Sequence, residues 1–119
     1  MAAAKYNITI EQGVDFTLEV TLTNSSGAAI DITSHTFESR IRRSPETDAI
    51  QSGGSPIQFT ANNSVNPSGG EVTFSLTDVQ TAALPGDNLI YDIFRTDTTG
   101  TKFRDLEGEI EVIERVTYE

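Results

Sequence analysis

Residues 15–23 have the sequence DFTLEVTLT, which contains the clearest periodic pattern of the chain. Its apolar side chains fall on every second residue, at Phe16, Leu18, Val20 and Leu22, and polar or acidic residues lie between them. A period of two places all four apolar side chains on one face of an extended chain. The stretch therefore predicts a β-strand with one buried face and one face in water.

The same alternation recurs along the rest of the chain. Short runs are expected at residues 6–10 and 30–32, and longer ones at 37–42, 57–61, 72–76, 89–94 and 103–112. Turn residues, such as those of segments 24–27 and 97–100, separate the runs. Seven to eight strands at this spacing predict an all-β protein, an immunoglobulin-like β-sandwich in which residues 1–119 form one domain.

The apolar positions of these runs are expected to form the core between the two sheets. The predicted buried set is Phe16, Leu18, Val20, Leu22, Phe37, Ile41, Phe59, Val72, Phe74, Leu76, Tyr91 and Ile93. Residues 89–94 are apolar on both faces in places, which predicts a central strand that is covered on both sides.

Two residues of the last strands have special roles in this interpretation. The alternation slips near Gly108, where a β-bulge is expected. Tyr91 lies near the start of the penultimate strand, a position from which a tyrosine of this fold often bonds back to the preceding corner. The alternative is a ring that packs in the core while its hydroxyl reaches water.

Three segments interrupt the strands. Thr77 and Gln80 match a capping box, so a short helical turn is expected near residues 78–84, before Pro85-Gly86. Segments 43–55 and 62–70 are rich in Ser, Gly and Pro and are expected to be surface loops. They are candidates for contact with neighbouring proteins.

Composition excludes several classes of function. The chain has no cysteine, which rules out disulfides, thiol nucleophiles and Cys-ligated metals. It has no long apolar run and no apolar segment near Met1, so neither a membrane span nor export is expected. Eight basic against eighteen acidic residues give a net charge of −10, which repels nucleic acid and anionic lipid. The charge serves either solubility or a specific basic partner.

The sequence offers little for catalysis or metal binding. His35 is the only histidine and falls in an expected turn, where a solvent-facing position is the simplest interpretation. Asp92, Asp97 and Asp105 bracket a hairpin, but a calcium loop that starts at Asp97 would place Lys102 where glycine is required. We therefore expect a protein that is not an enzyme and has no metal or cofactor, while a calcium-stabilised adhesive module stays as an alternative.

One basic cluster is the candidate partner-docking site. Arg40, Arg42 and Arg43 lie within four residues at the end of a predicted strand of an acidic chain. Arg40 and Arg42 would project from one face about 7 Å apart, a spacing that suits an acidic partner. Alternatively, Glu38 on the same face pairs with Arg40 within the chain.

The order of these elements resembles that of small virion proteins of tailed bacteriophages, especially marine cyanophages. More distantly, it is similar to the N-terminal module of phage baseplate upper proteins. The stretches that carry the resemblance are 6–16 (YNITIEQGVDF), 29–33 (AIDIT), 37–42 (FESRIR), 70–77 (GEVTFSLT), 84–86 (LPG), 91–92 (YD) and 106–112 (LEGEIEV). The chain departs from the pattern in its longer 43–55 loop and in an insertion at Asp87-Asn88.

The resemblance implies a non-enzymatic structural protein of the virion, made in the host cytoplasm. Its partners would be other virion proteins, and it would be present in many copies or as a homo-oligomer. Two locations stay open: an adaptor in the tail, neck or baseplate, or a decoration protein on the major capsid protein. A protein absent from the particle would instead be a free host-interaction protein.

Overall fold

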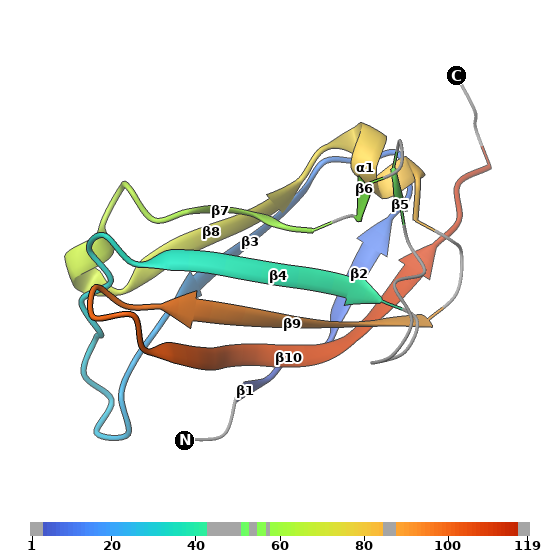
Figure 1. Cartoon of the computed structure of the whole chain (residues 1–119). Coiled ribbons are helices and arrows are strands. Elements are labelled where there is room, and N and C mark those ends of the chain that lie inside the picture. Colours follow the sequence, from blue (N-terminus) through green and yellow to red (C-terminus); the bar gives the residue numbers. More distant parts are fainter. Residues whose placement is uncertain (1–3, 43–50, 53–54, 57, 85–87, 117–119) are drawn as a thin grey trace.

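The computed structural model describes residues 4–42, 51–52, 55–56, 58–84 and 88–116. Two larger β-sheets, A and B, pack face to face, and two short strands form a small third sheet (Figure 1). Sheet A contains β1 (Ala4–Lys5), β2 (Ile8–Glu11), β10 (Lys102–Ile113), β9 (Asn88–Thr96) and β4 (Thr36–Arg42). Sheet B contains β3 (Phe16–Thr21), β8 (Glu71–Leu76) and β7 (Thr60–Asn62).

The order of the strands is that of an immunoglobulin fold. In sheet A, β4, β9 and β10 lie side by side, and β1 and β2 follow one another along the outer edge of β10. In sheet B the order is β3, β8, β7. These triplets correspond to the C-F-G and B-E-D strands of immunoglobulin domains. The structure thus confirms the predicted all-β, immunoglobulin-like sandwich.

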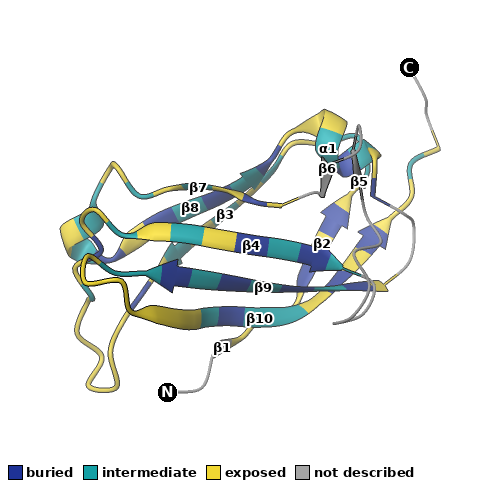
Figure 2. Ribbon diagram, viewed as in Figure 1, coloured by how far each residue is buried: buried dark blue, intermediate teal, exposed yellow. Residues whose placement is uncertain are grey.

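The core lies between the sheets, where buried residues alternate with exposed ones along each strand (Figure 2). Eight of the predicted core residues are buried: Leu22, Ile41, Phe59, Val72, Phe74, Leu76, Tyr91 and Ile93. The other four, Phe16, Leu18, Val20 and Phe37, are only half-buried and pack against the core from its margin. Their strands β3 and β4 are sheet edges, so one flank of each strand lacks a neighbouring strand.

Several core residues were absent from the predicted set. Ile8 and Ile10 are buried because β2 pairs in parallel with β10, where Ile8 lies beside Ile110 and Ile10 beside Val112. Leu84, Leu89 and Leu106 are buried as well. A period of two in a four-residue strand is too short a signal to predict such burial.

The prediction of a strand at residues 30–32 is wrong. Residues 30–32 form no strand, and an isolated bridge between Thr23 and Ala29 lies just before them. Ile32 is nevertheless fully buried, and its backbone N–H donates to the carbonyl of Pro67 over 2.9 Å. The segment is thus held by a loop of sheet B and lacks a strand partner.

The helical turn is confirmed as α1 (Asp78–Ala82). The Thr77 side chain accepts a bond from the backbone N–H of Gln80, and the Gln80 side chain accepts one from the backbone N–H of Thr77. This reciprocal pair is the capping box expected from the sequence. Pro85-Gly86, expected to end the helix, lies outside the described residues, as does Asp87.

The two expected loops contain short regular elements. Within segment 43–55, β5 (Gln51–Ser52) pairs with β6 (Ser55–Pro56), which corrects the expectation of a plain loop, while residues 43–50 lie outside the described part. Segment 62–70 contains a 3₁₀ helix, η1 (Pro67–Gly69). The tight turns at residues 24–27 and 97–100 are confirmed by hydrogen bonds from Gly27 to Asn24 and from Gly100 to Asp97.

The expected bulge occurs in β10, but at Asp105. The register passes from Arg104 beside Phe94 to Leu106 beside Ile93, so Asp105 has no partner on β9. Gly108 pairs regularly, and its lack of a side chain has another cause: a Cβ there would lie 2.1 Å from the carbonyl oxygen of Tyr6. The chain between β1 and β2 therefore runs along the edge of β10 in direct contact with its backbone.

Candidate functional site

The outward surface of sheet A is hollowed. We call this surface the sheet A face, and its hollow has a volume of about 970 Å³. The side chains around it belong to Lys5, Asn7, Glu38, Arg40, Arg42, Ile90, Asp92, Phe94, Lys102, Arg104, Glu107 and Glu109. All but three of these are charged, whereas the other face of the same sheet carries the core.

The register of the strands arranges this face in three rows. One row crosses the sheet as Glu38, Phe94 and Arg104, the next as Arg40, Asp92 and Glu107, and the third as Arg42, Ile90 and Glu109. In each row the middle residue belongs to β9. Ile90, Asp92 and Phe94 are half-buried, and the longer side chains on β4 and β10 flank them. The prediction that β9 is covered on both faces is therefore wrong. Its outer face is flanked by charged side chains, and a second packed layer does not lie there among the described residues.

Two of the three predicted docking arginines lie on this face. Arg40 is half-buried, and its Nη1 donates to the Ser39 carbonyl over 3.0 Å and to Oε1 of Gln58 over 2.6 Å. The alternative partner Glu38 is not among these bonds. Arg42 is half-buried two residues further along β4. Arg43 lies outside the described residues.

The sequence pattern did not indicate the other basic residues of the face. Lys5 comes from β1, and Lys102 and Arg104 come from β10, so they are distant from Arg40 in the chain. Arg104 contacts Glu107 as an ion pair, and its guanidinium lies 5.9 Å from the centre of the Phe94 ring. Only the strand order brings these residues together, which explains why local spacing could not predict them.

Charge is therefore unevenly distributed over the molecule. Five of the eight basic residues surround the hollow, together with four carboxylates. The net charge of the face is therefore about +1. Because the net charge of the whole chain is −10, the residues outside the face together carry −11. The sheet A face is the part of the surface that an acidic partner approaches with least repulsion.

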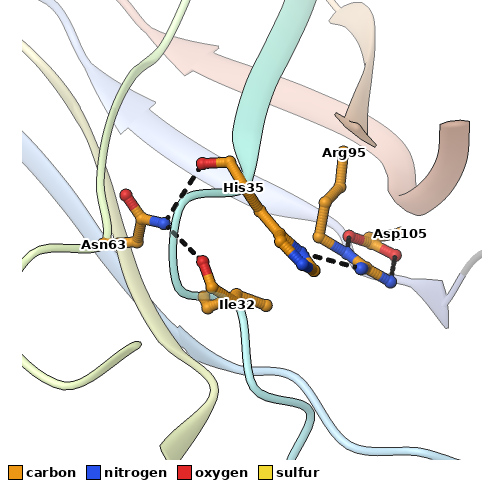
Figure 3. Close-up of polar contacts among 5 residues, drawn as sticks. All are labelled: Ile32, His35, Asn63, Arg95 and Asp105. Carbon is orange, nitrogen blue, oxygen red and sulfur yellow. Dashed lines mark hydrogen bonds and ion pairs between the residues drawn. The ribbon is translucent and has the colours of Figure 1, made fainter. Parts of the chain in front are cut away.

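A second polar cluster lies at the end of the sandwich that contains the 97–100 turn (Figure 3). Arg95 is 5% exposed, and it donates from Nε to Asp105 Oδ2 over 2.8 Å and from Nη2 to Oδ1 over 3.4 Å. The bulge at Asp105 turns this carboxylate inward, next to Leu106, which also faces the core. The Arg95 guanidinium further packs 4.5 Å from the Phe103 ring centre.

His35 belongs to this cluster, which corrects its interpretation as a solvent-facing residue. It is half-buried, and its Nδ1 lies 3.1 Å from Nη1 of Arg95. Because a guanidinium has donors only, the ring nitrogen accepts this bond. On the other side, Asn63 Nδ2 donates to the carbonyls of Ile32 and His35 over 2.9 and 3.3 Å. The cluster holds the loop before β4 against sheet A, which is a structural role.

Two of the three carboxylates considered for calcium are engaged: Asp105 in the ion pair with Arg95, and Asp97 in a turn, while Asp92 lies on the sheet A face. Asp97 Oδ1 accepts bonds from Thr99 and from the backbone of Thr101. The hydrogen bond from the Thr99 hydroxyl lowers the pKa of Asp97 below its ordinary value. Asp31 makes the same type of turn with Thr33, and the Thr33 hydroxyl likewise lowers its pKa. In the part of the chain that the structure describes, no three acidic or histidine side chains gather as a metal site.

Tyr91 makes a contact that neither prediction included. Its hydroxyl donates to the carbonyl of Tyr6 over 2.6 Å, and its ring packs edge-on against Phe59 at 5.8 Å. The preceding corner is not its partner, and the hydroxyl does not point to water. Burial raises the pKa of Tyr91 to about 12, and the negative charge of the Tyr6 phenolate adds to this effect. The tyrosine thus fastens the first segment of the chain across β10, beside Gly108.

Comparison with known proteins gives no relative: no protein-family model matches the chain, and no curated protein matches it. Among the described residues the longest helix is α1, with five residues, and no helix is long and apolar enough to cross a bilayer.

Proposed function

We propose that the chain is a non-enzymatic structural protein of a tailed-phage virion, where it acts as an adaptor between tail, neck or baseplate proteins. The single observation that carries the adaptor role is the sheet A face, where most of the cations of an acidic chain surround one hollow. The resemblance in the order of sequence elements supports the phage assignment.

The polar clusters elsewhere support a structural role. His35 and Asp105 are engaged by the buried Arg95, and Asp97 closes a turn. A general base must reach a substrate proton, and a calcium ligand must offer free oxygens to the ion. These groups are instead used in holding loops to the sandwich.

Decoration of the capsid is the second candidate, and the charge distribution is compatible with it as well. A decoration protein would seat its sheet A face on the shell and leave the remaining surface, with its charge of −11, in water. Such a charge keeps particles apart in solution. The same surface thus serves either location, and only its partner differs.

Quantitative mass spectrometry of purified particles tests both. A tail or neck adaptor is expected at a copy number that fits a closed three-fold or six-fold ring. A decoration protein is expected at on the order of hundreds of copies, in proportion to the capsid protein. Absence from particles that contain all other structural proteins would overturn both and leave a free host-interaction protein.

A further inference from the structure

The two outer columns of the sheet A face carry opposite charges at every row. On β4 the outward residues are Glu38, Arg40 and Arg42, so this column carries one negative charge followed by two positive charges. On β10 the residues of the same rows are Arg104, Glu107 and Glu109, so this column carries one positive charge followed by two negative charges. The central column on β9 is Phe94, Asp92 and Ile90, with apolar side chains at both ends.

This pattern is complementary to itself. A two-fold axis that runs along β9 places β4 of one copy over β10 of the other and keeps the rows aligned. All three rows then bring opposite charges together twice, because residue i contacts j and j contacts i in a two-fold interface. Along the axis Phe94 meets Phe94 and Ile90 meets Ile90. Only Asp92 then faces a residue of the same charge, namely Asp92 of the other copy. Arg40 lies beside Asp92 on the neighbouring strand, about 4.8 Å away.

We propose that the sheet A face binds the sheet A face of a second copy of this chain, as a symmetric pair with its axis along β9. This deepens the proposed assembly role, on which it rests, by naming a partner. Two chains of charge −10 repel each other, but the sheet A face is close to neutral. At physiological salt, charges further apart than about 8 Å are largely screened, so contact through this face costs little repulsion.

The pair is expected to be weak in dilute solution. The face spans three strands and three rows, less than the about 800 Å² per partner that a standard interface buries. In a particle, attachment of both copies to neighbouring proteins raises their local concentration and compensates for this weakness. The measurement therefore needs concentrated protein.

Sedimentation equilibrium at physiological salt, with protein up to about 1 mM, tests the pair. Variant one, Arg40→Glu with Arg42→Glu, makes the β4 column acidic throughout. Variant two, Glu107→Arg with Glu109→Arg, makes the β10 column basic throughout. Each alone is expected to dimerise at least about tenfold more weakly than the wild type, because like columns then face each other. Their equimolar mixture is expected to regain dimers in a one-to-one ratio, since both of its contacts join opposite columns.

The matched control is Glu19→Arg with Glu71→Arg on the outer surface of sheet B, which changes the net charge as much as variant two does. It is expected to dimerise like the wild type, and circular dichroism checks that every variant is folded. A monomeric wild type, a control as impaired as variant two, or a mixture that stays monomeric would overturn the pair. A monomeric wild type found at ring copy number in particles would overturn the pair alone, so the two proposals fail distinguishably.

Discussion

The two outward faces of the sandwich obey the same alternation and differ in content. Sheet B presents Thr17, Thr21, Thr60, Thr73 and Ser75, with Asn62, Glu19 and Glu71, and none of these is basic or apolar. Sheet A presents arginines, lysines and carboxylates around Ile90 and Phe94. An exposed face that only meets water needs polar side chains and nothing else. The apolar and basic content of sheet A is therefore the reason why we propose that this face binds a partner.

Both faces depend on one core, and removing its largest ring should weaken them equally. Phe74→Ala is expected to lower the free energy of unfolding by about 3–5 kcal/mol, because the ring is 2% exposed and meets Phe37 and Phe59 edge-on. Urea unfolding measures the change. The adjacent Thr73→Ala, on the sheet B surface, is the control and should cost less than about 0.5 kcal/mol. A loss for Phe74→Ala no larger than that of the control would contradict the packing described.

The described residues include one ion pair in the interior, Arg95 with Asp105, and one on the sheet A face, Arg104 with Glu107. Arg95→Met leaves the Asp105 carboxylate, 13% exposed, without its partner, so a loss of about 3 kcal/mol is expected. Arg104→Met removes the ion pair with Glu107 on the surface and should cost less than about 1 kcal/mol. Thermal and urea unfolding compare the two variants. Equal losses would mean that Arg95 is solvated in the folded protein.

Tyr91 joins β9 to the segment between β1 and β2 at the edge of sheet A, and its titration reports on that contact. Folding raises its pKa from 10.0 to about 12, so the folded state holds the proton more tightly than the unfolded state. The contribution is fully present below pH 10 and is lost as the pH rises toward 12. In an alkaline absorbance titration, one of the three tyrosines should ionise late.

The control for this titration is Tyr91→Phe, which lacks the hydroxyl. It should remove the late phenolate and, at neutral pH, cost about 1 kcal/mol for the lost bond to the Tyr6 carbonyl. The stability difference between wild type and variant should shrink between pH 10 and 12. A constant difference across that range would show that Tyr91 titrates like an exposed tyrosine.

The smallest effect is expected from calcium. The acidic turns of Asp31 and Asp97 are closed by their own threonines, so added calcium or EDTA should shift the melting temperature by less than about 1 °C. Magnesium at equal concentration controls for screening. A rise of several degrees with calcium alone would favour the adhesive module over the virion adaptor.

The features that could be predicted from the sequence are those that depend on residues close together in the chain. Alternation is set by residues two apart, and the capping box by residues three apart, so the strands of Phe74 and the Thr77 turn were predicted correctly. The parallel pairing that buries Ile10 and the contact of Tyr91 with Tyr6 depend on strand order. Residues more than eighty positions apart meet there, and no local pattern encodes such a meeting.

The candidate site was predicted only in part for the same reason. Arg40 and Arg42 are two residues apart on one strand, so their common face followed from the period of two. Lys5 and Arg104 join them through β1 and β10. Arg95 was missed although its position is informative: it falls on the inward phase of β9, where a charge requires a buried counter-charge.

The parallel pairing of β2 with β10 also determines how the molecule resists a mechanical force applied along these strands. The chain enters β2 at Ile8, beside Ile110, and leaves β10 after Ile113, the partner of Glu11, so these two points lie at opposite ends of the paired ladder. Tension between these two points therefore runs along the paired strands, and the ladder from Ile8 to Glu11 is loaded in shear. All of its hydrogen bonds must then yield together, whereas a hairpin pulled at its open end would unzip one bond at a time. The paired ends of β2 and β10 therefore resist a pull along the strands more strongly than such a hairpin would.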